Sequence, residues 1–66
     1  MTIGEKLMKE RIDRGLTREA LAERAGVTNV AIWKIEKGKV SPRLATLEKL
    51  ADALGFASAK YLVDGK

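Results

Sequence analysis

Four side chains that could recognise a nucleic-acid base lie together near the middle of the chain, in the segment Thr28–Lys37. If this segment is a helix, with about 100° per residue, Ile32 and Ile35 define its buried side. The residues on the opposite side, on its flank and in its first turn are Asn29, Val30, Ala31 and Lys34. Asn can bond adenine N6 and N7, Val and Ala can contact thymine methyl groups, and Lys can reach guanine or a phosphate. This set fits the DNA major groove and hints at a half-site that contains A·T pairs.

Other roles for this side of the helix stay open. Asn29 and Val30 could be ordinary surface residues, since single exposed apolar side chains are tolerated. Trp33, the one Trp in the chain, lies toward the same side. Its ring could pack over a neighbouring helix, contact DNA, or form an apolar patch with Val30 and Ala31 for a protein partner. The outward side therefore favours DNA, with a protein partner as the alternative.

The elements that would position these side chains are two short helices joined by a tight turn, predicted over residues 18–37. Ala22 is small where the second helix would cross the first. Gly26 can adopt the positive φ that ends a helix. In a helix-turn-helix of this kind, the second helix commonly enters the major groove.

Five helices and no strands are predicted, forming one all-α domain over residues 1–66, a compact five-helix bundle. The expected ranges are 3–14, 18–24, 29–37, a fourth helix that ends at 54, and 58–63. Threonines at positions 2, 17 and 28 and a serine at 58 are the expected N-caps. The fourth helix could begin at Pro42 with Ser41 as its cap, or nearer Leu44. Its apolar stripe is expected to be Leu44, Leu47, Leu50, Ala51 and Leu54.

The composition argues against an enzyme. The chain has 66 residues with no cysteine and no histidine, which removes the commonest general base and the commonest metal ligands. It has no Gly-rich phosphate loop, and we expect neither a cofactor nor a metal site. No run approaches the ~18 apolar residues of a membrane span, and acidic residues interrupt the N-terminal segment, so we expect a cytoplasmic protein without membrane contact. The formal net charge of +4 suits a polyanionic partner such as nucleic acid.

A longer set of residues, spread over nearly the whole chain, is typical of one family. The set comprises Ile3-Gly4-Glu5-Lys6-Leu7, Arg11, Gly15-Leu16-Thr17, Glu19-Ala20-Leu21-Ala22, Ala25-Gly26-Val27-Thr28, Ile32, Lys34-Ile35-Glu36-Lys37-Gly38, Pro42, Leu47, Leu50 and Ala53-Leu54-Gly55. In these residues the chain resembles the lambda-repressor-like XRE helix-turn-helix proteins, which include phage repressors, Cro proteins, restriction-modification controllers and antitoxins. The resemblance implies a homodimer, formed at least on DNA, that binds a roughly palindromic double-stranded operator.

The resemblance also implies roles for individual residues. Arg11 would pair with Glu36 and tie the first helix to the third, unless the two are unrelated surface charges. Arg43 would reach the minor groove, unless it is a solvated surface residue. Phosphate contacts would come from Thr17, Arg18, Thr28, Lys37 and Lys39. Dimer contacts would come from Phe56, Ala57, Ala59, Tyr61 and Val63, although the core of so small a bundle is the simpler place for Phe56 and Leu62.

Arg18 and Trp33 depart from the family pattern. The family usually has Gln at the position of Arg18, where the side chain meets the phosphate backbone. Arg keeps that role and adds charge, but it cannot brace a neighbouring base-reading side chain as Gln can. The family usually has a polar residue at the position of Trp33, so we carry no base contact over to it.

Motif, charge and resemblance together predict a sequence-specific DNA-binding transcriptional regulator, most simply a repressor, and not an enzyme. The alternative is a protein-interaction module on the same fold, of the antitoxin or anti-repressor type.

Overall fold

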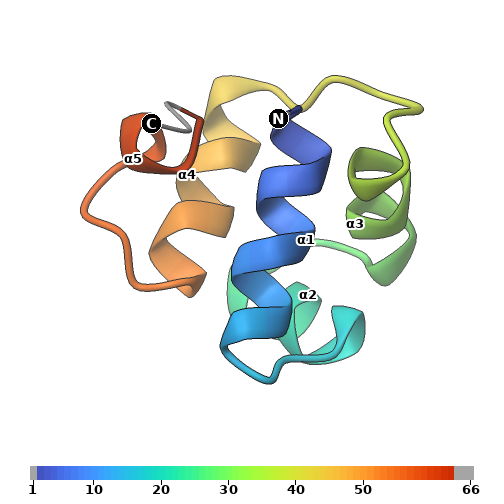
Figure 1. Ribbon diagram of the computed structural model, residues 1–66, viewed down its shortest axis with the longest axis horizontal. Coiled ribbons are helices and arrows are strands. Elements are labelled where there is room, and N and C mark those ends of the chain that lie inside the picture. The colour runs from blue at the N-terminus through green and yellow to red at the C-terminus, as the bar shows by residue number, and fades with distance from the viewer. Residues whose placement is uncertain (1, 64–66) are drawn as a thin grey trace.

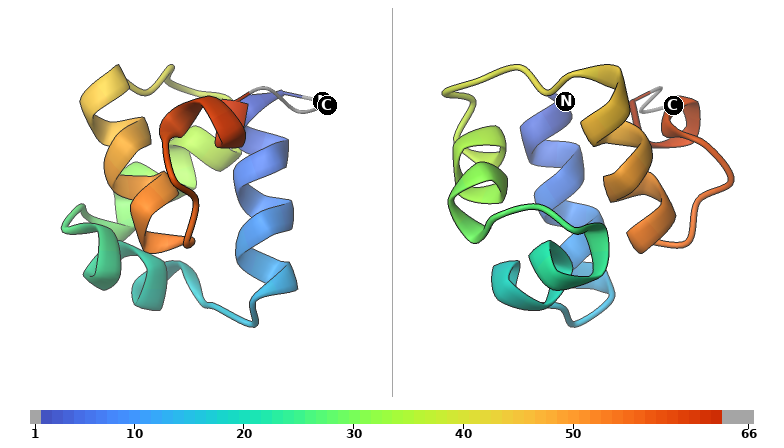
Figure 2. Two further views of the ribbon diagram at one scale, coloured as in Figure 1. Left: turned by 90° about the vertical axis from the view of Figure 1, so that its left-hand side faces the viewer. Right: turned by 180° about the vertical axis from the view of Figure 1, so that it is seen from behind.

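Five helices make up the protein in a computed structural model that describes residues 2–63, with side chains for residues 2–62 (Figure 1). They are α1 (Ile3–Asp13), α2 (Arg18–Ala25), α3 (Asn29–Glu36), α4 (Leu44–Ala53) and α5 (Ala59–Val63). Between residues 2 and 63 there is no strand, so the predicted all-α class is confirmed. α1 packs against α3 and α5, α2 packs against α3 and α4, and α4 packs against α5 (Figures 1 and 2).

Threonine side chains begin the first three helices, as predicted. The hydroxyls of Thr2, Thr17 and Thr28 accept hydrogen bonds from backbone N–H groups three residues further along the chain. The Glu5 carboxylate in turn accepts the backbone N–H of Thr2 at 2.9 Å, which completes a capping box. This hydrogen bond lowers the pKa of Glu5. Local sequence signals therefore set where α1, α2 and α3 begin.

The helix ends differ slightly from the predicted ranges. α1, α3 and α4 each end one residue earlier than expected, and α2 extends one residue further, to Ala25. α5 begins one residue later than expected, at Ala59. The larger correction concerns α4, which begins at Leu44 with Arg43 in an extended conformation as its N-cap residue. The first helical hydrogen bond runs from Leu47 N–H to the Arg43 carbonyl, so Ser41 and Pro42 belong to the connector. The prediction that Ser41 caps α4 was wrong, and the alternative prediction of a start near Leu44 is confirmed.

The core takes one fully buried large side chain from each helix. These residues are Leu7, Leu21, Ile32, Leu50 and Leu62. Leu62 is therefore a core residue, as expected. Leu44 was expected in the apolar stripe of α4 but is 71% exposed, because it lies in the first turn, beyond the part of α4 that meets the other helices. The buried stripe runs from Leu47 to Leu54.

The connection between α4 and α5 corrects the predicted dimer contacts. Ala59 is only 3% exposed and belongs to the core, so it offers no surface to a second copy. Its backbone N–H donates to the Glu48 carboxylate of α4, which fixes the start of α5. Phe56 is half-buried against the core. Ala57 and Tyr61 are exposed, and the Val63 side chain lies outside the described residues.

Arg14, which the sequence analysis did not single out, ties α1 to the end of α4. Its Nε donates to the Leu54 carbonyl at 2.7 Å, and its guanidinium lies 5.1 Å from the centre of the Phe56 ring. The same guanidinium bonds the Glu10 carboxylate, which also pairs with Lys6 at 3.1 Å. The hydrogen bond from Arg14, followed by that from Lys6, lowers the pKa of Glu10 below its usual 4.5.

Glu10→Gln is expected to lower stability at neutral pH and to have no effect in acid. Because the folded pKa of Glu10 lies below its unfolded value, its stabilisation is complete above about pH 4.5 and is lost as pH falls through the folded pKa. We expect a loss of about 1 kcal/mol or less at pH 7. Thermal unfolding of both proteins between pH 3 and 7 checks this, with Glu19→Gln, at an exposed position, as the control. A deficit that stays constant across this range would contradict it.

Within residues 2–63, no helix is both long enough and apolar enough to cross a membrane.

Candidate nucleic-acid interface

The turn between α2 and α3 fixes the relation of the two helices. Gly26 follows α2 with φ of 71°, in the left-handed region that suits glycine. The Val27 N–H then bonds the Ala22 carbonyl at 3.0 Å, and the next residue, Thr28, caps α3. Ala22 and Ala25 are buried against the core, so α2 can lie close to its neighbours. This turn confirms the predicted helix-turn-helix.

α3 has a buried side and an exposed side, and the predicted base-reading residues lie on the exposed side. Ile32 and Ile35 are at most 3% exposed, whereas Val30 is 60% exposed. Asn29 and Lys34 are exposed as well, and Ala31 is half-buried. The structure thus brings these four side chains onto one surface of a single short helix.

Two recesses flank Val30 on this surface. The first, about 400 Å³, lies between α3 and the connector to α4; its lining includes Ala31, Lys34, Val40, Pro42 and Arg43. The second, about 250 Å³, is lined by Arg18, Asn29, Val30 and Trp33. Val30 forms part of both walls. The exposed side of α3 is therefore an apolar ridge with a hollow on each side, and not a flat surface.

Basic side chains surround this ridge without acidic partners. Lys34, Lys37, Lys39 and Arg43 are all exposed, and none of them forms an ion pair within residues 2–63. Over residues 28–43 the sequence has these four basic residues and one acidic residue, Glu36. The side chain of Glu36 is 0% exposed, so its charge is not presented on the surface. The ridge and its connector form a positive surface.

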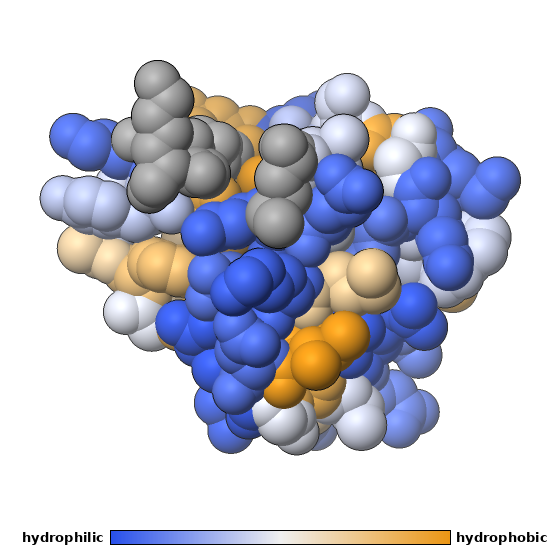
Figure 3. Space-filling model, in the orientation of Figure 1, coloured by the Kyte–Doolittle hydropathy of each residue, from blue (hydrophilic) through white to orange (hydrophobic). Residues whose placement is uncertain are grey.

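The surface along α1 has the opposite character. Its charges are paired with each other, Lys6 with Glu10 and Lys9 with Asp13, at one-turn spacing. The space-filling view shows many hydrophilic side chains on this face, with several separate apolar areas between them (Figure 3). On α1 itself, Ile12 is 57% exposed. Of the seven exposed Lys and Arg residues without an ion pair among residues 2–62, four therefore lie on α3, on the connector that follows it or at the start of α4.

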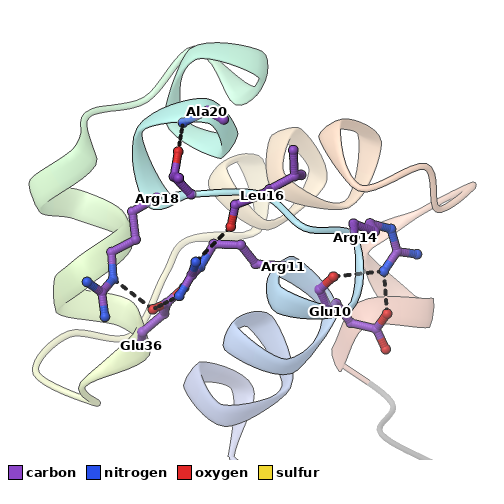
Figure 4. A network of polar contacts seen from close by, with 8 residues as sticks. Glu10, Arg11, Arg14, Leu16, Arg18, Ala20 and Glu36 are labelled. Carbon is purple, nitrogen blue, oxygen red and sulfur yellow. Dashed lines mark hydrogen bonds and ion pairs between the residues drawn. The ribbon is translucent and has the colours of Figure 1, made fainter.

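A buried charge network holds α3 to the other helices (Figure 4). Arg11 donates from Nε to Glu36 Oε2 at 2.7 Å and from Nη2 to Oε1 at 3.2 Å. Its Nη1 donates to the Leu16 carbonyl at 2.8 Å. The predicted Arg11–Glu36 pair is confirmed, and the alternative of two unrelated surface charges was wrong. The pair links α1 to the last turn of α3.

Arg18 adds a second cation to Glu36, which the sequence analysis missed. Its Nε donates to Glu36 Oε1 at 2.9 Å, so the start of α2 joins the same network. No local signal in the sequence indicates it, because Arg18 lies 18 residues before Glu36. The basic residues nearest to Glu36 in the sequence, Lys34 and Lys37, form no ion pair with it.

Trp33 lies at the edge of the exposed side of α3. It is 38% exposed, and the Lys39 ammonium lies 5.7 Å from the centre of its ring. The ring lines the second recess with Arg18, Asn29 and Val30. Trp33 therefore packs partly against the connector to α4 and also shapes the surface beside Val30.

Comparison with known proteins places this arrangement in a family. A family model described as helix-turn-helix matches residues 7–62. The chain is 38% identical over 58 residues to the HTH-type transcriptional regulator PuuR of Escherichia coli (strain K12), covering 88% of this chain and 31% of PuuR. It is 40% identical over 56 residues to the immunity repressor protein of Bacillus phage phi105, covering 85% of this chain and 39% of that repressor.

The fold matches that of a repressor solved on DNA. The crystal structure of the P22 c2 repressor in complex with a synthetic operator superposes with a TM-score of 0.89 at 32% identity, covering 100% of this chain and 98% of that one. The chain spans about a third of the length of PuuR. From the extent of the family match and these similarities, the chain belongs to the XRE-type, lambda-repressor-like helix-turn-helix family of transcriptional regulators.

Proposed function

We propose that this domain binds double-stranded DNA sequence-specifically and acts in a transcriptional repressor, with α3 in the major groove. The observation that carries the proposal is the exposed side of α3, where an amide, two apolar side chains and an ammonium group lie amid unpaired positive charge. The likeness to a repressor solved on an operator supports it. Such a protein works on the DNA in the cytoplasm, and the domain needs no cofactor for this.

Base recognition is assigned to four residues of α3. The Asn29 amide pairs with adenine N6 and N7, and the Lys34 ammonium bonds guanine or a neighbouring phosphate. Val30 and Ala31 contact thymine methyl groups, because an exposed apolar ridge beside a hollow suits a methyl group that projects into the major groove. The operator half-site thus contains A·T pairs opposite the first turn of α3.

Phosphate contacts are assigned to the groups around this ridge. Thr17 and Thr28 lie at the starts of α2 and α3, where exposed backbone N–H groups favour an anion, and Lys37 and Lys39 lie on the connector. Arg43 is exposed at the start of α4, on the rim of the larger recess, from which it reaches toward the minor groove. These contacts position the domain and carry little sequence information.

A homodimer on DNA is part of the proposal. Its contacts come from Ala57 and Tyr61, which are exposed, and from the exposed part of Phe56. A two-fold arrangement places the two copies of α3 about 34 Å apart, one turn of B-DNA. The operator is then roughly palindromic.

Selection from a random duplex pool tests the proposal, with Asn29→Ala and Val30→Ala as variants. The wild type is expected to enrich a two-fold symmetric site, and each variant to bind it roughly 10- to 100-fold more weakly while non-specific affinity stays unchanged. Lys49→Ala, an exposed position on α4, is the matched control and should keep the preference. Enrichment of a single half-site would contradict the homodimer but not specific DNA binding.

The absence of any enriched site would contradict specific DNA binding. Weak, salt-sensitive retention would then reflect charge alone. In that event the exposed side chains of Val30 and Trp33 favour a protein partner for the same surface.

A further inference from the structure

Arg18 has a guanidinium that is fixed on one side and open on the other. Its Nε is bound to the buried carboxylate of Glu36 at 2.9 Å, and its side chain is 34% exposed. Within residues 2–63, its Nη1 and Nη2 form no hydrogen bond. Figure 4 shows the end of this guanidinium beside α3, with one terminal nitrogen pointing away from Glu36. Two parallel N–H donors are thus presented to solvent from a held group.

The open side of Arg18 belongs to the base-reading surface. Arg18 lines the recess of about 250 Å³ with Asn29, Val30 and Trp33, all three of which come from α3. Val30 and Trp33 give this recess apolar walls, which would help to exclude water from hydrogen bonds made at its edge once DNA covers it. A group bound by Arg18 would therefore lie directly beside the groups bound by Asn29 and Val30.

The ion pair with Glu36 suits Arg18 to donating two hydrogen bonds to a base more than to attracting a phosphate. Glu36 lies between two guanidinium groups and partly neutralises both, which weakens the attraction of Arg18 for a distant phosphate. The same bond holds the plane of the guanidinium, so little side-chain entropy is lost when its outer edge binds. Guanine presents O6 and N7 in the major groove, and this pair of acceptors matches that edge.

We propose that Arg18 reads a guanine through O6 and N7, next to the base pairs contacted by Asn29 and Val30. The inference rests on the proposed function, since it places α3 in the major groove. It replaces the phosphate contact expected of Arg18 from the sequence. Arg18 is then a specificity-determining residue contributed by α2, and Glu36 is the residue that positions it.

Guanine analogues test this on the operator obtained by selection. Each guanine is replaced in turn by 7-deazaguanine, which lacks the N7 acceptor, and binding is measured with the full chain. One replacement is expected to weaken wild-type binding roughly 5- to 20-fold. Arg18→Lys keeps the charge but not the paired donors, so it should bind the unmodified operator more weakly and should not respond to that replacement. Circular dichroism verifies that the variant is folded.

The salt dependence separates a base contact from a phosphate contact. Arg18→Gln, which removes the charge, is expected to leave the slope of log affinity against log salt nearly unchanged, and Lys39→Gln, the matched control, to reduce it by about one without altering base preference. If wild type and Arg18→Lys respond alike to every analogue, Arg18 does not read guanine and the inference is overturned, while the selected site still supports the proposed function. If selection yields no site at all, the proposed function and the inference on Arg18 both fail.

Discussion

Glu36→Ala is expected to destabilise the domain by about 3–5 kcal/mol, because it leaves the Arg11 guanidinium buried without its carboxylate. Arg11 is only 8% exposed, so bulk water has little access to it. A single core in a chain of this length rarely supplies more than about 3–5 kcal/mol. Most of the protein should therefore be unfolded at room temperature, as urea titration followed by circular dichroism would show.

Two controls separate burial from charge in this experiment. Asp13→Ala breaks the Lys9–Asp13 pair, whose side chains are both 54% exposed, and should cost less than about 1 kcal/mol. The double variant Arg11→Met with Glu36→Leu replaces the buried charges by apolar groups and should recover much of the loss. A cost for Glu36→Ala as small as that of the exposed pair would show that the buried network does not stabilise the fold.

Gly4→Ala is expected to destabilise the domain by about 2–3 kcal/mol, although alanine favours a helix more than glycine does. A Cβ at position 4 would lie 2.2 Å from the backbone carbonyl oxygen of Ile35. Because the obstacle is backbone of α3 and not a flexible side chain, α1 and α3 must separate. Their separation disturbs the Arg11–Glu36 bonds between the same two helices.

The direction in which Gly4→Ala changes the stability distinguishes helix propensity from a steric clash. Helix propensity alone predicts that Gly4→Ala stabilises by about 0.5–1 kcal/mol, so the two explanations differ in direction. Thermal unfolding at neutral pH measures it, with Lys49→Ala on the exposed side of α4 as a control that should change little. A raised unfolding temperature for Gly4→Ala would refute the close contact between α1 and α3.

The fold was predictable from the sequence where its signals are local. Threonine N-caps are decided by a few neighbouring residues, and the starts of α1, α2 and α3 follow from them. The start of α4 could not be chosen from local signals because Ser41-Pro42 and Arg43-Leu44 offer competing starts, and the structure has the second. Leu44 and Ala59 were misplaced because the position of a helix end against the core depends on contacts distant in the sequence.

The polar contacts of the site show the same division. The exposed side of α3 followed from helical periodicity alone. The bond from Arg18 to Glu36 spans 18 residues, and that from Arg14 to the Leu54 carbonyl spans 40. No local pattern encodes which of several arginines reaches a given acceptor, since the answer depends on how the helices cross. The Arg11–Glu36 pair was predicted only because a family resemblance supplied the missing tertiary information.

The division of α3 into a buried and an exposed side has a consequence for evolvability. Ile32, Ile35 and Glu36 hold the helix in place, whereas Asn29 and Val30 project away from the core. Substitutions on the exposed side leave packing untouched, so this surface can change through stable intermediates. A single change of Glu36 has no such neutral route, because Glu36 holds two arginines. The fold can persist while the surface proposed to read DNA changes.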